Sequence, residues 1–401
     1  MSMKVRIQLC VMVFLEFFIW GGWLVTTSNY LTTIGFSGTD IGTAYSMNNI
    51  AAIVSPFFIG MIADKFFSAQ KVLGVMHLLS AVFLILAANT TDVFSFTFYI
   101  LAHSLCYMPT LALINSISFH QMKDPGKEFP PIRVLGTIGW IVAGWVITLL
   151  KAEQTNIPLI MAAVASGVLG IYAFTLPNTP PDRSKQTSFG DILGIKAWSL
   201  LKDRSFFIFS LGSLLICIPL AFYYNFTNVY LTNVGMPNPA GIQTLGQISE
   251  MVFMILMPFF FVRLGVKKMI AFGMLAWVLR YICFAFGASD TVTWMIITGL
   301  VLHGICYDFF FVTGQIYVDK FAPQDVKSCA QGFVTLLTYG VGMTIGSLVS
   351  GRLVDMCTTV SEEGEKVYNW LQIWLIPGCI ALVVLIMFYM LFKDVKTEEA
   401  K

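Results

Sequence analysis

The chain has 401 residues, of which 57% are hydrophobic and 11% are charged, and its formal net charge is +2. Soluble domains carry about 25% charged residues, so this composition excludes a soluble globular protein and indicates an integral membrane protein. Little sequence lies outside the apolar runs, which excludes a separate catalytic domain. The near-neutral net charge gives no indication of nucleic-acid binding, and the eight cysteines have no metal-ligand spacing, so we expect neither a metal nor a cofactor.

Apolar runs of transmembrane length follow one another along the chain. A helix needs about 20 such residues to cross a bilayer, and twelve runs meet this length. The predicted spans are residues 7–31, 41–62, 72–89, 97–119, 131–150, 157–176, 205–231, 243–262, 268–288, 292–318, 329–354 and 370–392. The first is too long for the core of a signal peptide, so we expect it to be retained.

The distribution of basic residues predicts the orientation of these spans. Lys and Arg gather in the N-terminus, in every second loop and in the C-terminal tail, whereas the opposite loops hold Lys151, Arg352 and Lys366. Because basic loops stay on the cytoplasmic side, we predict that both termini are cytoplasmic.

The longest polar stretch, residues 177–204, divides the predicted spans into two sets of six. It begins with a proline cluster followed by mixed charge, which is typical of a linker. We therefore predict one six-helix bundle over residues 1–176 and a second over 205–401. The tripeptide Pro-Phe-Phe at 56–58 recurs at 258–260. This repeat favours the parallel halves from which one large class of secondary transporters is built.

A few charged side chains fall inside the apolar stretches, namely Glu16, Arg133, Glu250, Arg280 and Asp308. A charge at the bilayer centre costs about 3 kcal/mol even on lenient scales, so each is expected to face a partner or a watery cavity. Glu16 has two open interpretations, a functional group or a side chain that reaches to the cytoplasmic interface. The histidines of the first half, His77, His103 and His120, are interpreted as structural or interfacial.

Polar and aromatic residues accompany these charges at helical spacing. In the fifth span the spacing i, i+4, i+7 predicts a cation, a hydroxyl and an indole on one helix face. The eighth span pairs an amide with a carboxyl, the tenth adds an imidazole, a phenol and a second carboxyl, and the seventh adds a phenol and two amides. In that order, the candidate residues are Arg133, Thr137 and Trp140; Gln247 and Glu250; His303, Tyr307 and Asp308; and Tyr224, Asn225 and Asn228.

Together these groups suit a neutral solute that carries hydroxyl groups and a flat ring. Carboxylates and amides bind hydroxyls, and indole and phenol rings stack on a ring system. Another neutral sugar or polyol fits the same groups. A second interpretation stays open for the acids, because Glu250 and Asp308 are also able to form a structural ion-pair network with Arg133 and Arg280.

Several segments are more specific than hydropathy. They are Trp20-Gly21, Ala63-Asp64-Lys65, Tyr107-Met108-Pro109-Thr110-Leu111, Phe129-Pro130-Pro131-Ile132-Arg133, Gly136-Thr137-Ile138-Gly139, Gln247-Ile248-Ser249-Glu250, Asp308-Phe309-Phe310 and Ala330-Gln331-Gly332. In these segments, which extend over nearly the whole chain, the sequence resembles bacterial nucleoside:proton symporters of the major facilitator superfamily. The resemblance implies an all-α membrane protein with twelve transmembrane helices in two six-helix bundles.

The resemblance also implies roles for individual residues. Those that match the nucleoside-contacting positions of the family are Arg133, Thr137, Gln247, Glu250 and Asp308. At three further positions, Trp140, His303 and Tyr307 stand where the family has phenylalanine, tyrosine and phenylalanine. Ala221 and Tyr224 stand where it has glutamine and asparagine, so Asn225 or Asn228 is the candidate to replace an amide contact. The base preference stays open.

The sequence therefore predicts a proton-coupled nucleoside importer that works by alternating access around a central site between the bundles. Asp308 is the preferred proton site, and Glu250 is expected to hold ribose hydroxyls and to be the second proton-coupling candidate. The alternatives are a proton-coupled carrier of another sugar or polyol, and a nucleoside-binding membrane sensor that does not transport. An enzyme is not expected. We further expect a monomer in the bacterial inner membrane, in contact with lipid, nucleoside and protons but not with nucleic acid.

Overall fold

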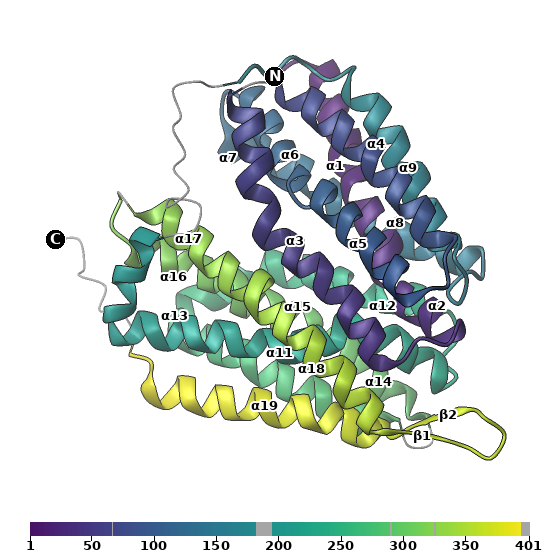
Figure 1. Ribbon diagram of the computed structural model, residues 1–401. Helices are drawn as coiled ribbons and strands as arrows, with labels where there is room; N and C mark the ends of the chain where they lie inside the picture. The colour runs from purple at the N-terminus through teal and green to yellow at the C-terminus, as the bar shows by residue number, and fades with distance from the viewer. Residues whose placement is uncertain (66, 182–194, 289–290, 325, 394–401) are drawn as a thin grey trace. The chain divides into compact units, whose positions relative to one another are not determined.

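The computed structural model describes the chain except residues 66, 182–194, 289–290, 325 and 394–401 (Figure 1). The middle of the predicted linker, residues 182–194, therefore lies outside the described residues, and so do the side chains of the repeat at 56–58.

The chain divides into two compact units. One comprises Met1–Thr187 with Tyr224–Thr244, and the other comprises Ser188–Tyr223 with Leu245–Lys401. This division differs from the predicted bundles because Tyr224–Thr244 groups with the first unit. The bundle boundaries at 176 and 205 stay a prediction.

The first unit is built from helices throughout. They are α1 (Met3–Leu24), α2 (Thr27–Thr33), α3 (Gly38–Lys65), α4 (Ala69–Ala88), α5 (Val93–Tyr107), α6 (Thr110–His120), α7 (Pro125–Glu128), α8 (Pro130–Leu149), α9 (Ile157–Ala173) and α12 (Pro239–Gln243), with the residues of α11 (Arg204–Asn233) after Tyr223. Helix α1 packs against α8 and α9, and α4 packs against α5 and α9. Pro109 precedes α6, where a proline ring is compatible with a helix start but not with a continued helix, so the fourth predicted span is broken there.

The second unit is also mainly helical. Its elements are η1 (Ile195–Lys202), the first part of α11, α13 (Leu245–Gly287), α14 (Thr293–Val301), α15 (His303–Tyr307), η3 (Asp308–Val312), α16 (Thr313–Phe321), α17 (Lys327–Thr335), η4 (Leu336–Gly342), α18 (Met343–Met356), β1 (Thr358–Val360), β2 (Lys366–Tyr368) and α19 (Trp370–Leu391). The strands β1 and β2 form a small antiparallel hairpin that the all-helical prediction missed.

Two features of this unit depart from regular helix. Gly265 interrupts α13 with φ 67°, a conformation that glycine adopts without a steric penalty. The loop predicted between residues 262 and 268 is thus a kink at one glycine. The segments η3 and η4 are π-helical, and such insertions frequently occur at functional sites. Since η3 begins at Asp308, the irregular backbone coincides with a predicted site residue.

Nine helical segments in the described parts of the chain are long and apolar enough to cross a membrane. They are Met3–Thr33, Ala69–Ala88, Val93–His120, Pro130–Leu149, Arg204–Asn233, Pro239–Gly287, Thr293–Phe321, Lys327–Met356 and Trp370–Leu391. The apolar helix Ile157–Ala173 is shorter. These findings define a multi-span membrane protein, while the count of twelve spans and the side of the termini stay predictions.

Glycines allow close helix contacts near the candidate residues. A Cβ atom on Gly139 of α8 would lie 2.3 Å from the backbone oxygen of Phe14 in α1, and one on Gly304 of α15 would lie 2.5 Å from the carbonyl carbon of Ser249 in α13. Both positions therefore need glycine, which fixes α8 against α1 and α15 against α13.

Candidate functional site

In the first unit, the candidate residues of the fifth predicted span lie on one continuous helix, α8. The Arg133 guanidinium carbon lies 4.3 Å from the centroid of the Phe17 ring, a cation–π contact with α1. Three positions after Thr137, Trp140 lies close to α1, where the two indole rings of Trp140 and Trp20 meet edge to face at 5.6 Å. Arg133 is exposed and Thr137 is half-buried. The arrangement leaves the guanidinium accessible beside an aromatic surface.

The seventh-span candidates belong partly to an amide cluster in the same unit. The Asn29 Nδ2 atom donates to Asn228 Oδ1 at 3.1 Å and to Thr232 Oγ1 at 2.7 Å. The Asn228 Nδ2 atom in turn donates to Gln243 Oε1 at 3.3 Å. Asn228 therefore uses both ends of its amide for bonds within the protein, so a role in solute binding requires these bonds to open. Asn225 is buried.

In the second unit, Asp308 is the most deeply buried of the candidate acids. Its side chain is 0% exposed, and among the described residues neither carboxyl oxygen has a hydrogen-bond partner. An ionised carboxylate in such a place carries a large desolvation penalty. Electrostatic repulsion also couples this carboxyl to that of Glu250. The site therefore has a group that gains from taking up a proton or a hydrogen-bond donor.

Glu250 lies beside a stack formed by the side chains of His303, Tyr223 and Arg280. Its Oε2 atom is 4.0 Å from Nε2 of His303. The His303 ring stacks on that of Tyr223, with centroids 5.0 Å apart, and the Arg280 guanidinium carbon lies 3.7 Å from the same tyrosine ring. Arg280 also donates from Nε to the Gly299 backbone oxygen at 2.9 Å. These contacts place Arg280 against a ring and a carbonyl, while Glu250 pairs with the imidazole.

The structure adds a tyrosine to the tenth-span candidates. The hydroxyl of Tyr339, in η4, donates to that of Tyr307 at 2.8 Å. The Tyr307 ring lies 5.9 Å from that of His303 on the preceding helical turn. Gln247 is buried on α13, and its Oε1 atom has no hydrogen-bond partner among the described residues. Tyr339 was not predicted, because it directly precedes a glycine-rich stretch, residues 340–351, that is typical of helix packing.

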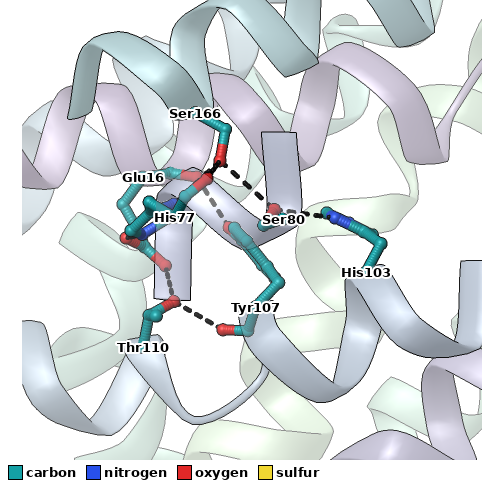
Figure 2. Close-up of polar contacts among 7 residues, drawn as sticks. All are labelled: Glu16, His77, Ser80, His103, Tyr107, Thr110 and Ser166. Atoms are coloured by element: carbon teal, nitrogen blue, oxygen red, sulfur yellow. Dashed lines mark hydrogen bonds and ion pairs between the residues drawn. The ribbon is translucent and has the colours of Figure 1, made fainter. Parts of the chain in front are cut away.

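A second polar cluster, in the first unit, was also missed (Figure 2). Glu16 was given an interfacial alternative, and this is wrong, since the side chain is fully buried. Its Oε2 atom lies 2.9 Å from Nε2 of His77 in α4, and its Oε1 atom accepts a hydrogen bond of 2.6 Å from the hydroxyl of Thr110. His77 is fully buried as well. The pair forms a carboxyl–imidazole site within the apolar helices.

Two serines extend this cluster to a second histidine. Ser166 Oγ in α9 lies 3.1 Å from Nδ1 of His77 and 3.2 Å from Ser80 Oγ, which is 2.8 Å from Nδ1 of His103 in α5 (Figure 2). All of these side chains are 0% exposed. Of the three histidines predicted to be structural or interfacial, His77 and His103 are therefore part of one hydrogen-bonded chain, whereas His120 is exposed.

Solved structures define the class of protein. The crystal structure of the nucleoside transporter NupG matches with a TM-score of 0.89 at 33% identity, over 98% of this chain and 100% of that one. The chain is accordingly a mainly helical membrane transporter with a major-facilitator-like fold. Residues 3–397 match the family described as Nucleoside H+ symporter, and the chain belongs to that family.

Two curated relatives agree along the full length. The Escherichia coli (strain K12) protein YegT is 41% identical over 406 residues, which are 99% of this chain and 96% of the relative. The xanthosine permease of the same organism is 35% identical over 408 residues, 98% of this chain and 96% of the permease. The family resemblance, the transport function and the localisation in the bacterial inner membrane are thereby confirmed, and an enzyme is excluded because these homologues are transporters.

Proposed function

We propose that this transporter imports nucleosides together with protons by alternating access, as a monomer with twelve transmembrane helices and cytoplasmic termini. The observation that carries the coupling is the buried carboxyl of Asp308, which lies at the start of a π-helical segment and has no hydrogen bond to the described residues. Proton uptake there removes the desolvation penalty of the charge, and this gain links protonation to a change of state.

In the proposal, the first unit contributes a flat recognition surface. Arg133 and Trp140 contact the base, because a guanidinium and an indole both stack on aromatic rings, and Thr137 on the same helix donates to a polar edge. Tyr224 adds a further ring. Asn225 and Asn228 supply amide contacts, the latter once its bonds to Asn29 and Gln243 open.

The second unit contributes the hydroxyl-binding and proton-binding groups. Glu250 and Gln247 lie three positions apart on α13, which suits paired hydrogen bonds to the vicinal hydroxyls of a ribose. His303 and Tyr307 form the aromatic wall, held by the contacts with Tyr223 and Tyr339. Because Asp308 and Glu250 are both acids and influence each other electrostatically, a proton on either one relieves their repulsion. In the proposed coupling, the protonated form is the one that binds the solute.

Nucleoside-driven proton uptake tests this assignment. Purified protein in liposomes is given nucleoside while the external pH is recorded, and binding is measured separately. Asp308→Asn is expected to bind nucleoside but to abolish the proton movement. The matched control is Asp319→Asn, an exposed acid of α16 whose Oδ1 atom pairs with Lys327 Nζ at 3.1 Å, and it is expected to behave as wild type. Proton uptake by Asp308→Asn equal to wild type would overturn the assignment.

A further inference from the structure

We propose that Glu16 and His77 form a second proton-binding site, buried in the first unit, which takes up and releases one proton during transport. This site is separate from the acids of the second unit. Its role in coupling rests on the proposed symport function, whereas protonation of the pair does not.

The spacing of the pair requires a shared proton. With Nε2 of His77 and Oε2 of Glu16 at 2.9 Å, two bare lone pairs would repel, so a hydrogen lies between them. It is bonded either to the nitrogen or to the oxygen. The hydroxyl of Thr110 occupies the other carboxyl oxygen, which stabilises a negative charge without neutralising it.

The Ser166 hydroxyl permits two protonation states without any movement of heavy atoms. Its oxygen lies 3.1 Å from Nδ1 of His77, 2.9 Å from the His77 backbone oxygen and 3.2 Å from Ser80 Oγ. When the Ser166 hydroxyl donates to Nδ1, the His77 proton is on Nε2 and is donated to an ionised Glu16. The pair then carries one negative charge.

In the other state the Ser166 hydroxyl turns to the backbone oxygen of His77 or to Ser80. Its lone pair then accepts a proton held on Nδ1 of His77, and the hydrogen between Nε2 and Glu16 is an additional one. The pair is then neutral overall, whether that hydrogen is bonded to oxygen or nitrogen. The two states differ by one proton, which balances the single negative charge, and the same framework of hydrogen bonds accommodates both.

The serines also give the proton a route away from the pair. Ser166 Oγ, Ser80 Oγ and Nδ1 of His103 follow one another at 3.2 and 2.8 Å, distances at which hydrogen bonds form (Figure 2). A proton leaving Nδ1 of His77 is passed along hydroxyls that each accept one hydrogen and donate another. The line ends at the buried ring of His103.

The other titratable groups that the described helices bring close to α1 do not contact the Glu16 carboxylate. The additional proton is therefore what neutralises its charge. From α5, Tyr107 donates its hydroxyl to the Glu16 backbone oxygen at 2.6 Å, not to the carboxylate. From α8, Arg133 lies on the Phe17 ring. From α9, Tyr172 donates to a backbone oxygen of α1 at 3.4 Å. The helix α6 faces the acid with the hydroxyl of Thr110. Among the described residues, the ion-pair partner of Glu16 is thus His77.

Infrared difference spectroscopy tests the protonation of the Glu16–His77 pair directly. The full-length protein in lipid vesicles is titrated from alkaline to acidic pH, and both the carbonyl band of a protonated carboxyl and the ring bands of a protonated imidazole are followed, because the additional hydrogen is bonded either to Glu16 or to His77. Glu16→Gln is expected to lose a band that the wild type gains, and His77→Gln to shift its midpoint. The controls are Glu362→Gln and His120→Gln, which remove exposed groups of the same kinds. Identical titrations for the wild type and Glu16→Gln would overturn the proposal.

A transport assay on the same vesicles tests the role in coupling. Exchange of labelled for unlabelled nucleoside at equal pH reports the nucleoside route and the folding of each variant. Accumulation driven by an inward proton gradient reports coupling. Glu16→Gln is expected to keep exchange and to lose accumulation, and wild-type accumulation by this variant would contradict the role in coupling. If the wild type itself fails to exchange nucleosides, the proposed function fails, while the spectra still decide the protonation of Glu16.

Discussion

The side-chain amide of Asn29 donates a hydrogen bond of 3.1 Å to that of Asn228, although the two residues lie 199 positions apart. The contact helps to explain why Tyr224–Thr244 groups with the first unit rather than with the rest of the second half. It also means that Asn228 has to exchange a protein partner for a nucleoside in the proposed mechanism.

The Asn29–Asn228 bond is expected to contribute modestly to stability. Because the amides of a membrane protein also find partners when the helices separate, a double-mutant cycle of Asn29→Ala and Asn228→Ala should give a coupling energy of about 0.6 kcal/mol. Denaturation of the purified protein in detergent measures it. Additive effects of the two substitutions would mean that the bond contributes nothing.

The contact between α15 and α13 is expected to tolerate no side chain at Gly304. A Cβ atom there would meet the backbone of Ser249 at 2.5 Å, so Gly304→Ala should destabilise the fold by about 1–3 kcal/mol through overpacking. Gly332→Ala is the matched control, since a Cβ atom on this helical glycine has nothing within 4 Å. The control should be neutral or slightly stabilising because alanine favours helix. Equal unfolding midpoints for the two variants would argue against the close approach.

Two substitutions of Glu16 are expected to distinguish the contribution of its charge to stability from the contribution of its hydrogen bonds. Glu16→Ala leaves His77 and Thr110 without their shared partner and should cost about 3–5 kcal/mol, as for other broken buried pairs. Glu16→Gln keeps an amide for both neighbours and should cost about 1–3 kcal/mol at most. Thermal unfolding in detergent compares the two. A glutamine variant as unstable as the alanine variant would mean that the site does not accept a neutral side chain.

The start of α5, outside the membrane spans, makes a pH-dependent contribution to the stability of the folded protein. Asp92 accepts the Ser95 backbone N–H at 2.8 Å, and this hydrogen bond lowers the pKa of the Asp92 carboxyl. A lowered pKa in the folded state means stabilisation that is present above the unfolded value of about 3.9 and is lost as the pH falls through the folded value. Acidification should therefore lower the unfolding temperature of the wild type more than that of Asp92→Asn, which caps the helix without titrating. Parallel pH profiles would contradict this.

Much of the fold follows from hydropathy, and the reason is physical. Apolar length is set by the bilayer, so most long helices fall where the runs predict them. The kink at Gly265 and the π-helical start at Asp308 were not predicted, because both depend on tertiary packing around a locally helical sequence. Three of the predicted residues of the second unit do lie near one another, since His303 contacts both Glu250 and Tyr307.

The Glu16–His77 pair was not predicted from the sequence. Each residue alone has an ordinary interpretation, an interfacial acid or a core histidine, and the helices α1 and α4 bring them together over 61 positions. A stronger signal was available in the buried acid itself. An acid in the first span requires a counter-group, and His77 is one of the titratable side chains that other spans offer to it.

The uptake of labelled uridine and adenosine into proteoliposomes under an inward proton gradient is the decisive test of proton-coupled nucleoside import. A protonophore and an excess of glucose serve as controls. Proton-coupled nucleoside import predicts accumulation that the protonophore abolishes and that unlabelled nucleosides, but not glucose, inhibit. Specific nucleoside binding without gradient-driven accumulation would contradict proton-coupled import and favour a sensor or another driving ion, and inhibition by glucose would contradict the assignment of the substrate.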